Sequence, residues 1–240
     1  MIGRSSDPRG PVVLLPGMMC DERQWVWQVK ALRGDGYDVS VGDLTTHSSV
    51  AELAEAVLAA APPTFALAGL SMGGIVALAL WCVAPERVTH LALLDTNPYA
   101  ESPARQALRA GEIELAMAHG VREQFVESMK PRYLADSRRK DQALRDEILA
   151  MALDLGPDVF RRQSIALRDR PDRVAILSSI RVPTLVLCGR EDSLCPLEYH
   201  LRMAECIPTA DLQVLADCGH LSPMERPEAV NAALRTWLAR

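Results

Sequence analysis

The chain has 240 residues, of which 49% are hydrophobic and 24% charged, and its net charge is −5. This length suits one large α/β domain, and the charge provides neither a basic patch for nucleic acid nor an acidic tail. The first ten residues lack the apolar core of a signal peptide, and no apolar stretch is long enough to span a membrane. We therefore expect a cytoplasmic protein whose partner is a small molecule, while the sequence leaves the oligomeric state open.

Short apolar runs alternate with helical patterns along most of the chain. We predict strands over residues 12–15, 38–44, 65–70, 88–94, 184–188 and 212–215, and helices over 24–32, 50–61, 73–83, 198–206 and 227–238. Buried parallel strands are short and apolar in this way. The alternation predicts an α/β fold with a mostly parallel sheet of about six strands and helices on both faces.

The alternation is interrupted between residues 98 and 181. No strand pattern occurs there, and helical patterns cover 105–118, 122–129, 141–155 and 159–167, with proline and glycine between them. We predict a helical cap at 98–181, inserted into a core formed by 1–97 and 182–240.

The pentapeptide Gly69-Leu70-Ser71-Met72-Gly73 lies between a predicted strand and a predicted helix. A G-x-S-x-G in this context indicates a nucleophile elbow, a strained turn that pushes the serine hydroxyl out of the sheet. Larger side chains at the two glycine positions would collide with the strand and the helix. The helix amino terminus beside Ser71 also favours negative charge on a substrate oxygen. Ser71 is therefore the predicted nucleophile.

A serine hydroxyl needs a base to accept its proton and a carboxylate to orient that base. In elbow-type enzymes the chain order is serine, then acid, then histidine. Asp192 and His220 follow the last two predicted strands in that order. Glu191 and Asp95 remain alternative acids, because the first adjoins Asp192 and the second ends another strand.

Four segments resemble the α/β-hydrolase superfamily in order and spacing: Leu15-Pro16-Gly17-Met18, the elbow continued to Gly74, Gly189-Arg190-Glu191-Asp192, and Gly219-His220 followed by Glu225-Arg226-Pro227-Glu228. The resemblance extends from residue 12 to the end of the chain outside the cap. It implies that Ser71 is the nucleophile, His220 the base and then the acid, and Asp192 the orienting carboxylate. It also implies an oxyanion hole made by the backbone amides of Met18 and Met72.

The sequence departs from the superfamily pattern at two points. Pro16 stands where many members carry histidine, but the loop acts through backbone amides, so the implied oxyanion role is unaffected. The leading hairpin of many members also has no counterpart before residue 12, so we expect six strands in place of eight.

The resemblance is greatest to small bacterial esterases and enol-lactonases. It implies a serine hydrolase that cleaves a carboxylic ester or lactone through an acyl-enzyme and requires no cofactor. Carbon–carbon hydrolases, cofactor-free perhydrolases and a lyase resemble the same motifs and remain alternatives, because fold does not decide function. A ligand receptor on a hydrolase scaffold is the alternative from another class.

The sequence gives less specific roles to the remaining candidate residues. Residues that could line a substrate pocket, with core packing as the alternative, are Trp25, Met117, Phe125 and Met129. His47, His90, His119 and His200 lack a catalytic context, and we expect surface or structural roles for them. The six cysteines lack metal-ligand spacing, so we expect reduced thiols and no metal site.

Overall fold

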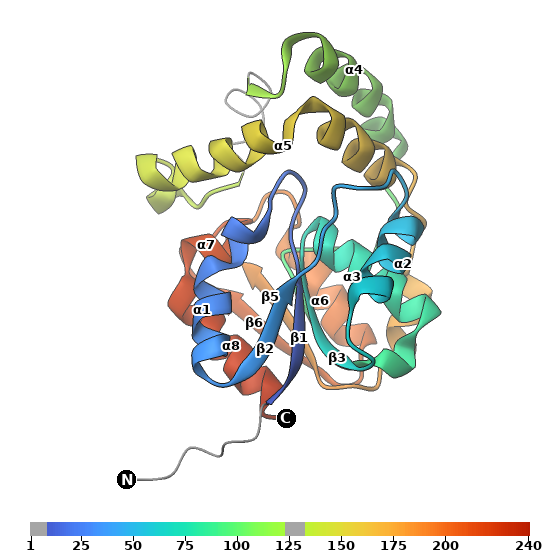
Figure 1. The fold of residues 1–240 in the computed structure, drawn as a ribbon, viewed down its shortest axis with the longest axis vertical. Coiled ribbons are helices and arrows are strands. Elements are labelled where there is room, and N and C mark those ends of the chain that lie inside the picture. The colour runs from blue at the N-terminus through green and yellow to red at the C-terminus, as the bar shows by residue number, and fades with distance from the viewer. Residues whose placement is uncertain (1–8, 123–132) are drawn as a thin grey trace.

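The centre of the molecule is a parallel sheet of six strands in the order β2-β1-β3-β4-β5-β6 (Figure 1). The computed structural model describes residues 9–122 and 133–240. The strands are β1 (Arg9–Leu15), β2 (Tyr37–Val41), β3 (Phe65–Leu70), β4 (Val88–Leu94), β5 (Thr184–Gly189) and β6 (Ala210–Leu215). All five neighbouring pairs are parallel. The predicted fold class and the six-stranded sheet are confirmed.

Helices cover both faces of the sheet (Figure 1). One face carries α1 (Val26–Gly34) and α8 (Pro227–Leu238), and the other carries α2 (Val50–Ala60), α3 (Met72–Val83) and α6 (Leu197–Cys206). Successive side chains of a strand point to opposite faces. In β1, Val12 and Leu14 therefore join the core under α1 and α8, whereas Val13 and Leu15 join the core under α2 and α3.

The strand order places the loop after β1 beside the loop after β3. Strand β1 pairs with β2 on one side and with β3 on the other, and Leu15 lies opposite Gly69. The chain passes from β1 to α1 on one face of the sheet and from β3 to α3 on the other face, so its connections diverge at this point. Open α/β sheets bind ligands at such a switch point, outside the carboxyl ends of their strands.

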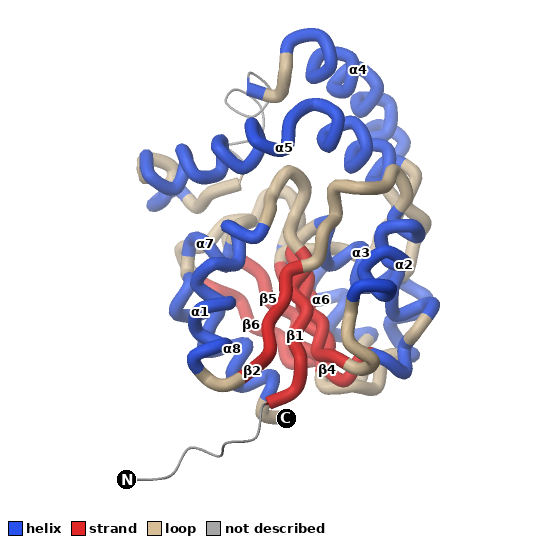
Figure 2. Tube along the Cα trace, viewed as in Figure 1, coloured by secondary structure: helices blue, strands red, loops and turns tan. Residues whose placement is uncertain are grey.

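Two long helices, α4 (Pro103–His119) and α5 (Gln142–Arg168), lie over the carboxyl edge of the sheet (Figure 2). Between β4 and β5 the described residues form helices and connecting segments, including η5 (Asp136–Arg138) and η6 (Val174–Ser179). The helices predicted at 141–155 and 159–167 are joined through a kink at Gly156, where φ is 73° ahead of Pro157. The helix predicted at 122–129 lies almost entirely outside the described residues.

The remaining differences from the predicted elements are small. Strand β2 ends at Val41 in place of residue 44, and the predicted helix at 24–32 is divided into η1 (Glu22–Trp25) and α1. The short elements η2 (Pro85–Arg87) and α7 (Ser222–Glu225) were not predicted. No helix in the described ranges combines the length and the apolar character that crossing a bilayer requires.

The close approach of β3 to α3 predicts that Gly69→Ala destabilises the fold. A Cβ atom at Gly69 would overlap the backbone carbonyl of Gly73, which cannot move independently of α3. Overpacking of this kind costs about 1–3 kcal/mol or more. Urea denaturation should show a loss of this size in the free energy of unfolding.

Gly111→Ala is the matched control, because Gly111 lies within α4 and a Cβ atom there would meet nothing within 4 Å. This substitution should be neutral or stabilising by up to about 1 kcal/mol, since alanine favours helix more than glycine. Equal stabilities for the two variants would contradict the packing argument.

Candidate active site

Ser71 lies at the turn between β3 and α3 in a backbone conformation that is rare for a residue with a side chain. Its φ is 52° and its ψ is −115°. The Ser71 amide donates to the Leu94 carbonyl at 2.9 Å, and the Thr96 hydroxyl donates to the Ser71 carbonyl at 2.7 Å. The end of β4 and the segment that follows it therefore hold this strained turn through both the amide and the carbonyl of Ser71, as the elbow motif requires.

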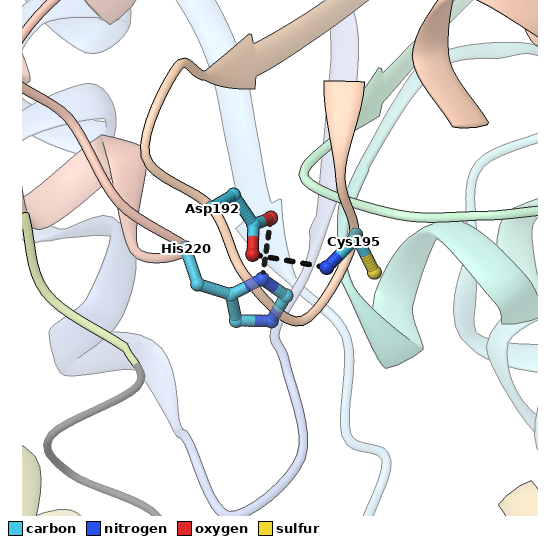
Figure 3. Close-up of side chains that lie close together, drawn as sticks. All are labelled: Asp192, Cys195 and His220. Carbon is cyan, nitrogen blue, oxygen red and sulfur yellow. Dashed lines mark hydrogen bonds and ion pairs between the residues drawn. The ribbon is translucent and has the colours of Figure 1, made fainter. Parts of the chain in front are cut away.

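His220 is hydrogen-bonded to both Ser71 and Asp192. Its Nε2 atom lies 2.9 Å from Ser71 Oγ, and its Nδ1 atom lies 2.8 Å from Asp192 Oδ2. Figure 3 shows the second of these contacts, with Asp192 between His220 and Cys195. The other oxygen, Asp192 Oδ1, accepts from the amides of Leu194 and Cys195 at 2.8 and 3.0 Å. The structure thus brings the three predicted catalytic residues into one hydrogen-bonded chain.

The two alternative acids occupy other positions. Glu191 accepts a hydrogen bond from the Asp136 amide at 2.8 Å. Asp95 accepts from the Gly189 amide at 2.8 Å and from the Ser222 hydroxyl at 2.5 Å. Of the three acids considered, Asp192 alone is hydrogen-bonded to the His220 ring.

Buried charges around His220 set its electrostatics. Burial lowers the pKa of His220, but the charge and hydrogen bond of Asp192, with smaller contributions from Asp95 and Glu225, raise it above its ordinary value overall. Burial and the neighbouring Asp192 carboxylate raise the pKa of Asp95 well above its ordinary value. The Asp192 carboxylate therefore favours a proton on His220, as a base that must accept one requires.

The loop that carries His220 is organised by a buried carboxylate whose role the sequence did not reveal. Glu225 accepts from the amides of Gly219 and Leu221 within the loop, and from Ala135 in the segment between β4 and β5. The His220 amide donates to the Tyr133 carbonyl at 2.7 Å, and the two rings stack at a centroid distance of 5.7 Å. The Glu-Arg-Pro-Glu motif identified this segment in the sequence, but it did not predict these hydrogen bonds.

Two buried glutamines hold the loop after β1, and neither was predicted. Gln24 accepts from the Gly17 amide at 2.8 Å, and Gln163 of α5 accepts from the Met19 amide at 2.8 Å. Gln163 also donates to the Leu44 carbonyl at 3.0 Å, so it joins α5 to the loops after β1 and β2. Met18 lies between the two fixed amides, and its assignment with Met72 to an oxyanion hole stays a prediction.

Ser71 opens into a cavity of about 360 Å³ between the sheet edge and the helices above it. The residues that line it include Met18, Ile75, Tyr99, Leu167 and His220. Its lining residues come both from the loops after the strands and from the segment between β4 and β5. A cavity of this size suits a small organic molecule.

The pocket residues suggested by the sequence are not the ones that line this cavity. Trp25 is completely buried and belongs to the same core cluster as Val12 and Leu14 of β1. Met117 is 45% exposed, because it lies on the outer side of α4. Neither is among the described residues that line this cavity. Phe125 and Met129 lie outside the described residues.

Asp192, Cys195 and His220 also form a cluster of possible metal ligands. One atom from each lies within 4.8 Å of the others. Asp192 and His220 are already bonded to each other, and burial together with the Asp192 charge raises the pKa of the Cys195 thiol well above its ordinary value. A metal would require the thiolate and would displace the contact between Asp192 and His220. The cluster is therefore explained by the triad arrangement.

A model of the alpha/beta hydrolase family matches residues 12–233. The chain belongs to this family. The match includes β1 through most of α8, and therefore every element that positions Ser71, Asp192 and His220. The fold and the geometry of the site agree with membership of the alpha/beta hydrolase family.

Related proteins in this family differ in what they do. The chain is 29% identical over 245 residues to the dihydrolipoyllysine-residue acetyltransferase component of the acetoin cleaving system of Pseudomonas putida, covering 96% of this chain and 64% of that protein. A thermophilic esterase from Thermogutta terrifontis is 30% identical, with a TM-score of 0.88 over 97% of this chain and 90% of that one. The enol-lactonase of Burkholderia xenovorans is 22% identical, with a TM-score of 0.87 over 99% and 94%, which shows the same fold.

His200 supports the elbow from behind and should make stability depend on pH. Its Nε2 atom accepts from the Thr96 amide at 3.0 Å, and its Nδ1 atom lies 3.3 Å from the Pro196 carbonyl. Burial lowers the pKa of His200 from 6.5 to about 4. Since the unfolded state binds the proton first as the pH falls, this residue should remove about 2 kcal/mol from the free energy of unfolding between about pH 8 and about pH 5.

Urea denaturation of wild type and His200→Gln at the two pH values measures this contribution. The glutamine cannot be protonated, so the variant should lose about 2 kcal/mol less than wild type on acidification. His119→Gln, at an exposed position on α4, is the control and should follow wild type. Parallel pH profiles for wild type and His200→Gln would rule the contribution out.

Proposed function

We propose that the chain is a serine hydrolase that cleaves a carboxylic ester or lactone of a small molecule through an acyl-enzyme. The hydrogen-bonded chain from Ser71 through His220 to Asp192, at the wall of the cavity, supports this proposal most strongly. A nucleophile, its base and the carboxylate that orients the base are the groups that acyl transfer requires. The resemblance to an esterase at 30% identity over most of both chains adds support for ester chemistry.

Each step is assigned to a residue of the site. His220 takes the proton of the Ser71 hydroxyl as the oxygen attacks the carbonyl carbon, and the amides of Met18 and Met72 stabilise the oxyanion. His220 then donates that proton to the leaving oxygen. A water molecule that loses its proton to His220 attacks the acyl-enzyme, and the departure of Ser71 Oγ with that proton releases the acid. Asp192 keeps the imidazole in the required tautomer throughout.

Three of the alternatives use the same three residues: carbon–carbon hydrolysis and lyase chemistry break a different bond, and perhydrolysis transfers the acyl group to peroxide in place of water. Carbon–carbon hydrolysis, perhydrolysis and lyase chemistry place different demands on the cavity wall, and no contact of the described residues favours one of them. A receptor that only binds its ligand has no need for a base in contact with a serine. The test compares the rate of simple ester hydrolysis with the rates of the three alternative reactions on the same preparation. Faster ester hydrolysis favours the esterase proposal, and a receptor should catalyse none of these reactions.

A fluorophosphonate probe tests whether Ser71 is an activated nucleophile. Intact-mass measurement should show one adduct on wild type and none on Ser71→Ala, whose ester turnover should fall by roughly a thousandfold or more. Ser102→Ala is the control, because Ser102 lines the same cavity but caps α4. It should keep the adduct and the turnover. Labelling that survives in Ser71→Ala would disprove the assignment, and a wild type with neither adduct nor turnover would favour a receptor.

The role of Asp192 is tested by the pH dependence of kcat/KM. Because Asp192 raises the pKa of His220, activity in wild type should be lost on acidification at a pH above 6.5. Asp192→Asn should reduce kcat by about a thousandfold or more and move this loss to lower pH, since burial then acts on His220 with less opposition. Glu191→Gln is the control and should leave the profile in place. A larger loss in Glu191→Gln than in Asp192→Asn would reassign the acid.

A further inference from the structure

The cavity that contains Ser71 has a positively charged wall. Three arginines line it, Arg105, Arg109 and Arg170, whereas Glu101 is the only carboxylate among its described lining residues. Arg105 is neutralised separately, because its two terminal nitrogens contact the two carboxylate oxygens of Glu112 at 2.7 and 2.8 Å. The charge balance of the wall therefore depends on Glu101 and the two arginines that share it.

Arg109 and Arg170 bind one carboxylate between them. Arg109 donates to both oxygens of Glu101 at 2.8 Å, and Arg170 Nη1 donates to Glu101 Oε1 at 3.0 Å. The three side chains are only 6%, 9% and 5% exposed for Arg109, Arg170 and Glu101, respectively. Burial raises the pKa of Glu101, but the two arginines outweigh it and hold the pKa below its ordinary value. Within the part of the chain that the structure describes, two buried positive charges thus face one negative charge, and one positive charge is left over.

An excess buried charge is costly unless a partner of opposite sign neutralises it. One arginine would suffice to neutralise Glu101. Arg170 also donates to the Tyr99 carbonyl at 2.9 Å and to the Leu167 carbonyl at 2.8 Å, but these neutral acceptors do not balance its charge. Donor capacity also remains in the pair. Among residues 9–122 and 133–240, the only acceptor near Arg109 Nη1 is the Met18 sulfur at 3.7 Å, and Arg170 Nη2 has no acceptor. Guanidinium groups present their donors in a fork that matches a carboxylate.

We propose that the substrate is a small ester or lactone that carries a carboxylate, and that Arg109 and Arg170 bind this carboxylate. The inference rests on the proposed function and names its substrate class. The contact of Arg109 with the Met18 side chain places the carboxylate site next to the loop assigned to the oxyanion hole. The anionic group of the substrate and its reacting carbonyl therefore lie on neighbouring parts of one cavity.

Two pairs of esters test the proposal, and each pair consists of an ester with a carboxylate and a neutral ester that lacks it. In the first pair, mono-4-nitrophenyl glutarate is compared with 4-nitrophenyl pentanoate, which has a methyl group in place of the carboxylate. In the second, 3-carboxyphenyl acetate is compared with phenyl acetate, so that the charge lies in the leaving group. In at least one pair, kcat/KM of the anionic ester should exceed that of the neutral ester by about tenfold or more, as one charge-assisted hydrogen bond provides.

Two substitutions remove the excess charge and leave Glu101 paired. Arg109→Gln leaves Glu101 with Arg170, and Arg170→Gln leaves it with Arg109. In each variant the ratio of the anionic to the neutral kcat/KM should fall by about tenfold. Arg202→Gln is the matched control, because it removes the same charge from an exposed ion pair with Glu205, and it should leave the ratio unchanged.

The outcomes separate this proposal from the proposed function. Equal rates within both pairs, from a protein whose Ser71 is labelled by fluorophosphonate, would overturn the anionic substrate and leave the serine hydrolase intact. A protein with no labelling and no turnover would overturn the proposed function itself. A high ratio that survives both substitutions would overturn the assignment to these arginines. If neither variant folds, inhibition of the wild-type protein provides the test. Glutarate should inhibit hydrolysis of a neutral ester at concentrations about tenfold lower than glutaramide does. Equal inhibition by the two compounds would overturn the proposal.

Discussion

The hydrogen bond between His220 and Ser71 joins residues 149 positions apart, and the geometry of the whole site depends on it. A contact of 2.9 Å at such a separation requires the loops after β3, β5 and β6 to end at one edge of the sheet in fixed conformations. A parallel sheet provides the common edge, because all its carboxyl ends point the same way. It does not provide the loop conformations. The proton transfer that we propose depends on tenths of an ångström, so each loop needs further constraints.

Those constraints are buried polar side chains that bind backbone amides. Gln163 fixes the loop after β1, Glu225 the loop of His220, and Asp95 the end of β5 together with Ser222. Each of these three groups is nearly inaccessible to water, so an unpaired partner would be expensive and the loop conformation with paired groups is strongly favoured. Gln163 belongs to α5, so the helices above the sheet help to shape the catalytic loops as well as enclosing the cavity.

Sequence analysis predicts those features of the fold and the site that depend on local sequence patterns. Gly69 and Gly73 follow from the tight turn, the strands follow from apolar runs, and the order of Ser71, Asp192 and His220 indicates their shared site. The residues that sequence analysis missed act over long range: Gln163 lies 144 positions from the Met19 amide that it binds. Helical periodicity also did not distinguish residues that face the cavity from those that face the core or the solvent. Met117 was suggested for the pocket for that reason, and Trp25 because it follows the loop after the first strand. Arg109, an unpredicted charged residue on α4, lines the cavity.

The charges around the cavity lie on different elements, and this separation connects the proposed chemistry to substrate choice. The Asp192 carboxylate contacts His220, where its negative charge favours the imidazolium that the proposed base forms on accepting a proton. The unbalanced arginine charge lies on α4 and just after the end of α5. An anionic group is repelled from the first region and attracted to the second, so the field of the protein orients such a substrate before any short contact forms. Because these arginines belong to the segment between β4 and β5, that segment can alter substrate preference without disturbing the hydrogen bonds of Ser71.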